Sequence, residues 1–389
     1  MGLQDLDIAI VGAGIGGLTA ALALQRFGFT VQVFEQAEQL AEVGAGLTIS
    51  PNATHALDAL GLADDMARLA DIPTAGAVAD YKTGETMLET YRGDRPFKTY
   101  GAHYYQIHRA DLHALLAEKV RNNDPSSIHT AHMFVGCEQT SEEVAIRFAN
   151  GAGKRCDVLV GCDGGASRVR SEVFAPEPVV FTGQVAFRAL TRASAIPEEV
   201  MMPPSKAYIG PDRLFTRYYI RKRTEVNVVA LGRQPGWEEE GWTIPAEKSE
   251  LHDLYREFHD DVHTIIDAIP DGHLYKWALR DRSPRERWTK GRVVMLGDAA
   301  HPMTPFLGQG AAMAIEDGLV LGRCFAAAES VEEALRRYEI ARKDRANGVQ
   351  LQSRQQAELY QGSAHKNYHP GRNAEGRGLF NYNPATVPV

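Results

Sequence analysis

The chain of 389 residues is poor in cysteine, with only Cys137, Cys156, Cys162 and Cys324. These four follow no Cys-x-x-Cys or metal-type spacing, so we expect reduced, buried thiols rather than a disulfide framework, and no metal site. No run of about 18 apolar residues occurs, which argues against a membrane-spanning helix. Positive charge is also in deficit, because 42 Lys and Arg face 50 Asp and Glu for a net charge of −8. This balance argues against nucleic acid or an anionic membrane surface as a partner.

The N-terminal segment lacks the basic and apolar regions of a secretory leader, so we expect a cytoplasmic protein. What is present is typical of a globular chain, with 44% hydrophobic and 24% charged residues. The length favours two lobes rather than one small core. We expect a monomer or a homodimer.

A glycine-rich turn follows the first apolar segment and precedes a helical pattern. Gly12 suits the tight turn, Gly14 lets a pyrophosphate approach the backbone, and Gly17 lets the helix pack closely on a sheet. The next strand-like segment, Thr30–Phe34, ends at Glu35, where dinucleotide-binding proteins place a carboxylate on the ribose hydroxyls. The pattern predicts dinucleotide binding without identifying the dinucleotide.

The residue pattern changes in the middle of the chain. Short segments rich in β-branched and aromatic residues, at 184–192, 206–210, 214–221 and 225–231, predict an antiparallel sheet. A buried strand returns at 292–296, so this sheet is an insertion. We therefore predict an α/β fold with a Rossmann-like, three-layer, parallel-sheet domain and an inserted antiparallel-sheet domain. The predicted divisions are 1–75, 100–178 and 275–330 for the first domain, 76–99 and 179–274 for the second, and 331–389 for a C-terminal helix and tail.

A second motif, Asp163-Gly164, follows a buried strand and precedes a helix start. It suits a site where backbone and side chains meet a nucleotide. The alternative is an ordinary strand–turn–helix in which the Asp caps the helix, and the residues alone do not separate the two.

A third motif runs from Gly297-Asp298 to Gly308-Gln-Gly310-Ala311. Asp298 follows a strand and can accept hydrogen bonds from ribityl or ribose hydroxyls. Gly308 and Gly310 clear side chains so that a flat ring can lie against the backbone, and the helix that begins there directs its positive end at that ring. This is the geometry that a flavin needs.

The three motifs in this order resemble the single-component, class A FAD-dependent aromatic hydroxylases, which have the p-hydroxybenzoate hydroxylase fold and include salicylate and 3-hydroxybenzoate 6-hydroxylases. The resemblance implies tightly but non-covalently bound FAD, with Arg109 near its adenosine–ribityl region. It also implies that Asp163 and Gly164 serve both FAD and NAD(P)H. The cofactor-binding residues that we carry over are Gly12, Gly14, Gly17, Glu35, Arg109, Asp163, Gly164, Asp298, Gly308, Gly310 and Ala311.

Within this family the motifs at 107–113, 185–190 and 297–303 are most similar to those of 6-hydroxynicotinate 3-monooxygenases. The chain departs from them at Thr48, Leu214 and Phe306, where those enzymes have active-site histidines. The resemblance implies hydroxylation of a single-ring hydroxylated aromatic or heteroaromatic acid of the hydroxybenzoate, salicylate or hydroxynicotinate type. The resemblance also implies NADH or NADPH and O₂ as cosubstrates, a reaction that passes through a flavin C4a-hydroperoxide, and decarboxylation where the attacked carbon bears the carboxylate.

Three polar residues are candidates for contact with the substrate. His301 is a base or proton relay, or a loop histidine hydrogen-bonded to nearby backbone. Tyr218 binds the substrate hydroxyl, or is a half-buried sheet tyrosine. Arg188 anchors the carboxylate, or forms a structural ion pair. The expected pocket walls are Thr48, Leu214, Pro305 and Phe306.

Two other classes of protein stay open. One is another FAD oxidoreductase of this fold, either a reductase or a flavin-dependent halogenase. The halogenase segment Trp-x-Trp-x-Ile-Pro is matched only in its second half, because Trp242-Thr-Ile244-Pro245 is preceded by Glu240 in place of the first Trp. The other class is a flavin-bound protein without catalysis.

Overall fold

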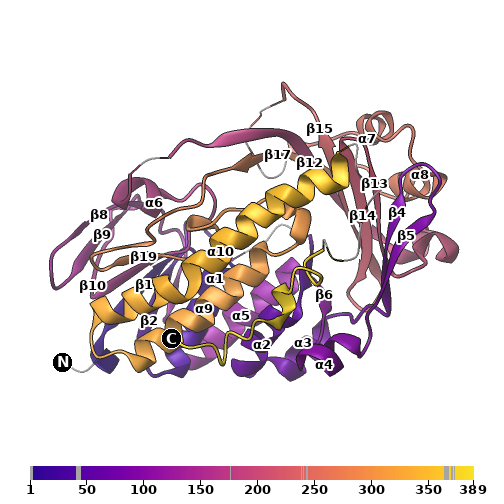
Figure 1. Cartoon of the computed structure of the whole chain (residues 1–389). Helices are drawn as coiled ribbons and strands as arrows, with labels where there is room; N and C mark the ends of the chain where they lie inside the picture. The colour runs from indigo at the N-terminus through magenta and orange to yellow at the C-terminus, as the bar shows by residue number, and fades with distance from the viewer. Residues whose placement is uncertain are drawn as a thin grey trace.

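The computed structural model describes residues 3–40, 45–175, 177–237, 239, 241, 244–362, 368, 371 and 373–389. The first domain is built on a six-stranded sheet in the order β18-β19-β11-β1-β2-β7 (Figure 1). Its strands are parallel except β18 at the edge, which pairs antiparallel with β19. The bounds are β1 Asp7–Val11, β2 Thr30–Phe34, β7 Ile128–His129, β11 Val158–Gly161, β18 Thr289–Lys290 and β19 Val293–Met295.

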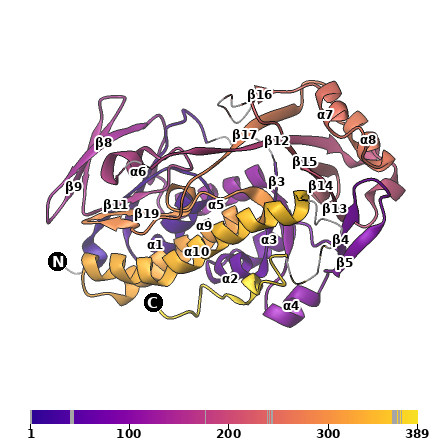
Figure 2. The same cartoon turned by 45° about the horizontal axis from the view of Figure 1, so that its top comes forward.

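Two further layers complete this domain. Helices pack along one side of the sheet, and a three-stranded antiparallel sheet lies on the other (Figures 1 and 2). The helices are α1 Ile15–Arg26, α5 Arg109–Asn123 and α9 Gly310–Ala327, and the strands are β8 Phe134–Gln139, β9 Val144–Phe148 and β10 Gly153–Cys156. Strands β11 and β19 are apolar throughout, and β1 is apolar after Asp7, as expected where both faces of the sheet are covered. The three-layer arrangement agrees with the prediction.

The second domain is an eight-stranded sheet in the order β16-β17-β12-β15-β14-β13-β4-β5. It is antiparallel except where β4 pairs parallel with β13, a contact between chain segments that lie far apart. The bounds are β4 Ala75–Asp80, β5 Thr86–Tyr91, β12 Val180–Arg192, β13 Ser205–Gly210, β14 Arg213–Ile220, β15 Glu225–Arg233, β16 Ile244–Pro245 and β17 Leu274–Asp281. Because β17 belongs to this sheet, the sheet extends past the predicted boundary at residue 275, and the domain division stays a prediction.

The two faces of the second sheet have different partners, as alternation along its strands requires. Phe215 and the apolar residues on the same face of the sheet form a core with α7 Lys248–Leu254 and α8 Asp260–Asp267. Leu214 lies on the opposite face and packs with Phe306, which belongs to the first domain's third motif. The face that carries Leu214 therefore turns toward the first domain.

The remaining elements connect the two sheets. The long helix α10, Val331–Gln361, runs beside α9, and its far end contacts β13 and β14 (Figures 1 and 2). The others are β3 Gly46–Ile49, β6 Tyr105–His108, α2 Pro51–Ala59, α3 Ala63–Leu69, α4 Arg95–Tyr100, α6 Arg168–Val173, and the 3-10 helices η1 Leu3–Asp5, η2 Ala193–Ala195, η3 Glu198–Met201, η4 Gly297–Ala299, η5 Pro305–Leu307 and η8 Leu379–Asn381.

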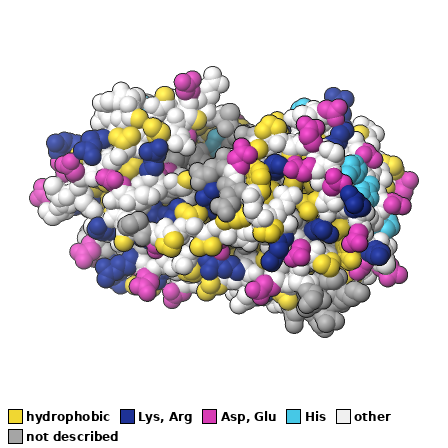
Figure 3. Space-filling model, turned by 90° about the horizontal axis from the view of Figure 1, so that it is seen from above, with side chains coloured by type: hydrophobic (Ala, Val, Ile, Leu, Met, Phe, Trp, Pro, Cys, Tyr) yellow, Lys and Arg dark blue, Asp and Glu magenta, His cyan; other side chains and the backbone are white. Residues whose placement is uncertain are grey.

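The surface carries charges of both signs, interspersed over the face shown in Figure 3. All four cysteines are free thiols. Among the described residues, no helix has the length and apolar character needed to cross a bilayer.

Candidate cofactor and substrate site

The N-termini of α1 and α9 lie side by side at the carboxyl edge of the parallel sheet. Neither helix has a side chain that caps its first turn. Small residues let the two helices touch along their length, and a Cβ on Gly318 would lie 2.7 Å from the backbone nitrogen of Ala20. The close pairs are Gly16 with Ala314, Gly318 with Ala20, and Gly322 with Ala23. Because the pairs follow the same order on both helices, the helices are parallel, and their two positive ends face the same space.

The first glycine-rich turn leaves its backbone open. Gly12 has a φ of +104°, and a Cβ there would lie 2.4 Å from the carbonyl oxygen of Cys162. A Cβ on Gly17 would lie 2.0 Å from the Gly12 oxygen, whereas a Cβ on Gly14 would meet nothing within 4 Å. Glu35 Oε2 accepts a hydrogen bond of 2.9 Å from the N–H of Ala13. The turn thus places a carboxylate and an unobstructed helix end together, as a nucleotide pyrophosphate and ribose require.

Asp163 lies in the turn that precedes α6. Its carboxylate accepts hydrogen bonds from the Ser167 hydroxyl and from the N–H groups of Arg168 at 2.6 Å and Val169 at 3.0 Å. This geometry supports the helix-capping alternative, and a direct contact with a nucleotide stays a prediction. Gly164 has a φ of +78° with open space beside it.

The second and third motifs are tied together by Arg170, a link that the sequence did not reveal. Its guanidinium donates to the carbonyl oxygens of Gly165 and, at 3.1 Å, of Ala299. The Ser-Arg-Val-Arg spacing was the available signal, but Ala299 belongs to a segment more than 100 residues away.

The third motif completes a wall next to the α9 N-terminus. Asp298 is accessible to solvent, yet the surrounding protein raises the pKa of its carboxyl, partly offset by the charges of His301 and Arg109. A Cβ on Gly310 would lie 4.0 Å from Asp298 Oδ1, and one on Gly308, whose φ is +63°, would lie 3.0 Å from Thr48 Oγ1. These positions, with half-buried Ala311 in the first turn of α9, fit a flat, hydroxyl-bearing cofactor such as FAD.

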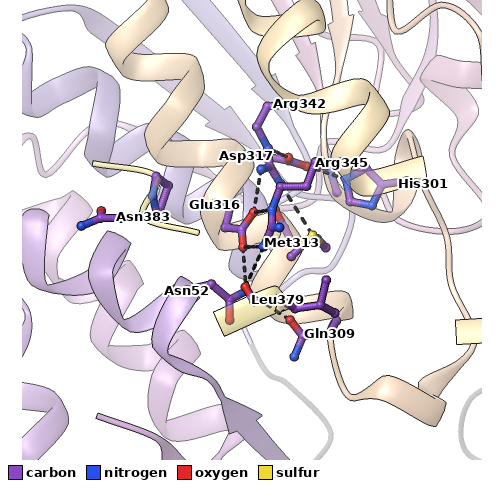
Figure 4. A network of polar contacts seen from close by, with 12 residues as sticks. Asn52, His301, Gln309, Met313, Glu316, Asp317, Arg342, Arg345, Leu379 and Asn383 are labelled. Carbon is purple, nitrogen blue, oxygen red and sulfur yellow. Dashed lines mark hydrogen bonds and ion pairs between the residues drawn. The ribbon is translucent and has the colours of Figure 1, made fainter. Parts of the chain in front are cut away.

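His301 lies behind this loop with no exposed surface (Figure 4). Its Nε2 is 2.5 Å from Asp317 Oδ2, and Asp317 Oδ1 accepts a hydrogen bond of 2.6 Å from Arg342. Burial alone would raise the pKa of Asp317, but the charges of His301 and Arg342 and their hydrogen bonds lower it to about 2. The geometry supports the alternative that His301 is a hydrogen-bonded loop histidine. Its partner is the Asp317 carboxylate, whereas nearby backbone was expected from the sequence. Direct base catalysis by His301 stays a prediction.

A second buried acid supports the N-cap residue of α9. Glu316 accepts hydrogen bonds from Asn52 at 2.6 Å and from Arg345 at 2.8 Å, and it lies 2.6 Å from Arg342 (Figure 4). Asn52 also donates to Gln309 at 3.1 Å. Sequence reasoning missed this set, although adjacent acids inside an apolar helix were a visible signal.

The expected substrate residues lie on one face of the second sheet, in the facing loop or, for Thr48, on β3. Tyr218 is 7% exposed, burial raises the pKa of its hydroxyl, and the described part of the chain offers that hydroxyl no hydrogen-bond partner. A Cβ on Gly46 would lie 2.7 Å from the Tyr218 ring, so the start of β3 packs against Tyr218, and half-buried Thr48 follows two residues later on the same strand. Phe306 and Leu214 form an apolar wall, and Pro305 begins the 3-10 turn that carries Phe306.

Arg188 shares this face. Arg188 on β12 pairs with Val229 on β15, and Val229 pairs with Thr216 on β14. Thr216 is two residues before Tyr218 on the same face of the strand. Its guanidinium lies over the Trp277 ring at 5.2 Å from the centroid. Arg188 is thus separated from β14 by one intervening strand, β15. Its role as an anchor for the substrate carboxylate stays a prediction.

Comparison with known proteins decides the family. The family model described as "FAD binding domain" matches residues 5–353. The chain belongs to this family of FAD-binding proteins. It is 35% identical over 354 residues to the 6-hydroxynicotinate 3-monooxygenase of Pseudomonas fluorescens, covering 89% of this chain and 90% of the relative. It is 33% identical to the 3-hydroxybenzoate 6-hydroxylase of Polaromonas naphthalenivorans (strain CJ2), with 92% and 88% covered.

The fold is shared with a solved structure of Klebsiella pneumoniae HpxO complexed with FAD and uric acid. The TM-score is 0.84 at 24% identity, covering 98% of this chain and 97% of that one. The resemblance to FAD-dependent aromatic hydroxylases, the α/β fold and the FAD cofactor are thus confirmed. Trp242, which matches the halogenase motif, and Glu240, which departs from it, lie outside the described residues.

Proposed function

We propose that this FAD-binding protein is a monooxygenase that hydroxylates a single-ring hydroxylated aromatic or heteroaromatic acid with O₂ and NADH or NADPH. The observation that carries the proposal is the pairing of two uncapped helix ends and Asp298 with a sheet face that presents Tyr218. The relatives named above act on 6-hydroxynicotinate and 3-hydroxybenzoate by their names, which supports this substrate class.

The residues of the chain divide the work between the two sides of the site. The open turn at Gly14 and the carboxylates of Glu35 and Asp298 would hold the hydroxyls and phosphates of FAD. Bound FAD, once reduced by the nicotinamide, supplies the activation of O₂. Leu214 and Phe306 exclude water from the space next to the flavin loop.

Tyr218 is the group that we assign to the substrate hydroxyl. Because burial raises the pKa of Tyr218, its hydroxyl stays protonated at neutral pH and donates a hydrogen bond. A donor of this kind favours the phenolate form of the substrate, which is the better nucleophile. We assign Arg188, on the same face, to the substrate carboxylate.

A substrate screen tests the proposal. Purified holoenzyme is mixed with 3-hydroxybenzoate, 4-hydroxybenzoate, salicylate or 6-hydroxynicotinate, and oxidation of NADH and of NADPH is measured together with product mass. At least one acid is expected to stimulate oxidation and to gain one oxygen atom. Stimulation by none, or stimulation with release of hydrogen peroxide alone from all four, contradicts the proposal and favours a reductase or oxidase.

Tyr218→Phe tests the assigned donor. Loss of one hydrogen bond of about 1 kcal/mol corresponds to about fivefold weaker binding of the substrate hydroxyl. Flavin absorbance titrations give the dissociation constant, and a pH series shows whether ionisation of the bound phenol moves to higher pH. Tyr219→Phe is the matched control because Tyr219 faces the other side of β14. Equal behaviour of the two variants would assign Tyr218 to the sheet alone.

A further inference from the structure

A small cavity lies between the second sheet and the C-terminal part of the chain, and its lining includes Ser205, the cross-strand partner of Tyr218. Its volume is about 130 Å³, and its lining includes Thr216, Tyr104, Tyr360 and Tyr368. The described residues that line it include none of those assigned above to FAD or to the substrate.

The floor of the cavity is a continuation of the face that carries Tyr218. Ser205 on β13 pairs with Tyr218 on one side and with Gly76 on the other, and Ala207 pairs likewise with Thr216 and Val78. Directly paired residues project from the same face of a sheet. The hollow exists because the side chains at the middle of the floor, Gly76, Ser205 and Ala207, are absent or small.

Tyrosine hydroxyls line the other side. The Tyr360 and Tyr368 hydroxyls lie 3.4 Å apart, and burial raises the pKa of both. Tyr104 is close enough to Tyr218 and to Tyr360 to affect the pKa of each. At neutral pH, Tyr360 and Tyr368 therefore present uncharged groups that both donate and accept hydrogen bonds.

The charge in the described lining of the cavity is paired. Among the described lining residues only Arg92 is charged, and it is paired with Glu375 at 3.1 Å. The Arg92 guanidinium also lies 4.3 Å from the centre of the Tyr104 ring. A carboxylate placed here would be desolvated without a free counter-charge, which is costly. An uncharged polar group would instead find hydroxyl partners.

We propose that this cavity is a specificity subsite for an uncharged, hydrogen-bonding substituent on the substrate ring, such as an amino, hydroxyl, methoxy or carboxamide group. The inference rests on the proposed function, because it takes the ring to lie beside Tyr218. The cavity volume of about 130 Å³ is large enough to admit such a substituent.

Ligand pairs test the subsite without turnover. Flavin absorbance of the holoenzyme is titrated with 3-hydroxybenzoate and with its derivatives that carry one further amino, methoxy, carboxamide or carboxylate group at each open ring position. At least one neutral substituent is expected to tighten binding relative to the parent, and the carboxylate at the same position is expected to weaken it. A preference for the carboxylate would overturn the proposal, as would weaker binding with every neutral substituent.

Variants locate the preference. Ala207→Leu fills the floor and is expected to weaken binding of the preferred derivative about tenfold while the parent stays within about twofold. Tyr368→Phe, which removes only one oxygen, is expected to weaken that derivative about fivefold. Tyr219→Phe, on the opposite face of the sheet, is the control. Equal losses for parent and derivative in both cavity variants would overturn the subsite.

The outcome for the parent acids separates this inference from the function on which it rests. If neither 3-hydroxybenzoate nor the other acids of the screen perturb the flavin or stimulate nicotinamide oxidation, the proposed function fails. If they do, but the cavity variants do not discriminate, only the subsite fails.

Discussion

Asp317 is a carboxylate without exposed surface, and three neighbours make this tolerable. His301 and Arg342 contact its two oxygens, and the N–H of Gly297 donates to Oδ2 at 3.0 Å. An isolated buried charge would be strongly unfavourable, but a charge with this many partners is not. The same contacts hold the start of the third motif in place, so stability and cofactor binding depend on one residue.

Asp317→Asn is expected to lower the free energy of unfolding at pH 7 by about 3–5 kcal/mol, because it leaves Arg342 buried with a lost partner. The folded pKa of about 2 lies below the ordinary 3.8. The ionised carboxylate therefore contributes about 2 kcal/mol above pH 4, and this contribution is lost as the pH falls toward 2. Urea unfolding of the apoprotein between pH 2 and pH 7 measures it.

The control for this series is Asp253→Asn, an exposed acid that pairs with Arg256 on the surface. It is expected to leave the free energy of unfolding nearly unchanged at every pH. A gap between wild type and Asp317→Asn that stays constant from pH 7 to pH 2 would show that the charge of Asp317 is not what stabilises the fold.

At the scale of elements, the site depends on how closely α1 and α9 approach. Their contact has no large side chains at the three close pairs, so the distance between the axes is set by glycine and alanine. A wider spacing would separate the two helix ends and weaken their joint effect on a bound anion, since that effect falls off within a turn.

Gly318→Ala tests this spacing. The added methyl would lie 2.7 Å from the backbone nitrogen of Ala20, so the helices must move apart. We expect a loss of about 1–3 kcal/mol in stability together with faster FAD dissociation, measured by thermal unfolding and by flavin fluorescence. Gly348→Ala on α10 is the matched control, because its methyl meets nothing within 4 Å and is expected to stabilise by about 0.4–1 kcal/mol. Stabilisation by both variants would contradict the spacing argument.

Local sequence patterns predicted where these elements lie in the chain, but they did not predict which elements contact one another. The turn at Gly12, the strand before Glu35 and the helix after Gly310 follow from residues that are neighbours in the chain. The pairing of Gly318 with Ala20 joins positions almost 300 residues apart, and no local pattern carries that information. The same reason explains why the structural alternative for His301 named backbone partners, whereas the partner of its Nε2 is Asp317.

At the scale of the whole molecule, the alternation of two domains was visible in the sequence as a change from helical to strand-like texture. Residues 76–99 were predicted to join the later strands in the second domain, but the parallel pairing of β4 with β13 was not predicted, because a polar stretch with turn signals does not show which strand it pairs with. The cavity between the second sheet and the C-terminal part of the chain also escaped sequence analysis. It is formed where β4, β13 and β14 meet Tyr360 and Tyr368 from the C-terminal part of the chain.

The support of the flavin loop by α10 has a consequence for biosynthesis. The acids Glu316 and Asp317 leave the ribosome before Arg342 and Arg345, whose guanidinium groups neutralise them. Until that helix has emerged and docked, two adjacent negative charges have no arginine partner, and the loop from Asp298 to Gly310 lacks its backing. We therefore expect cofactor loading to follow translation of nearly the entire polypeptide.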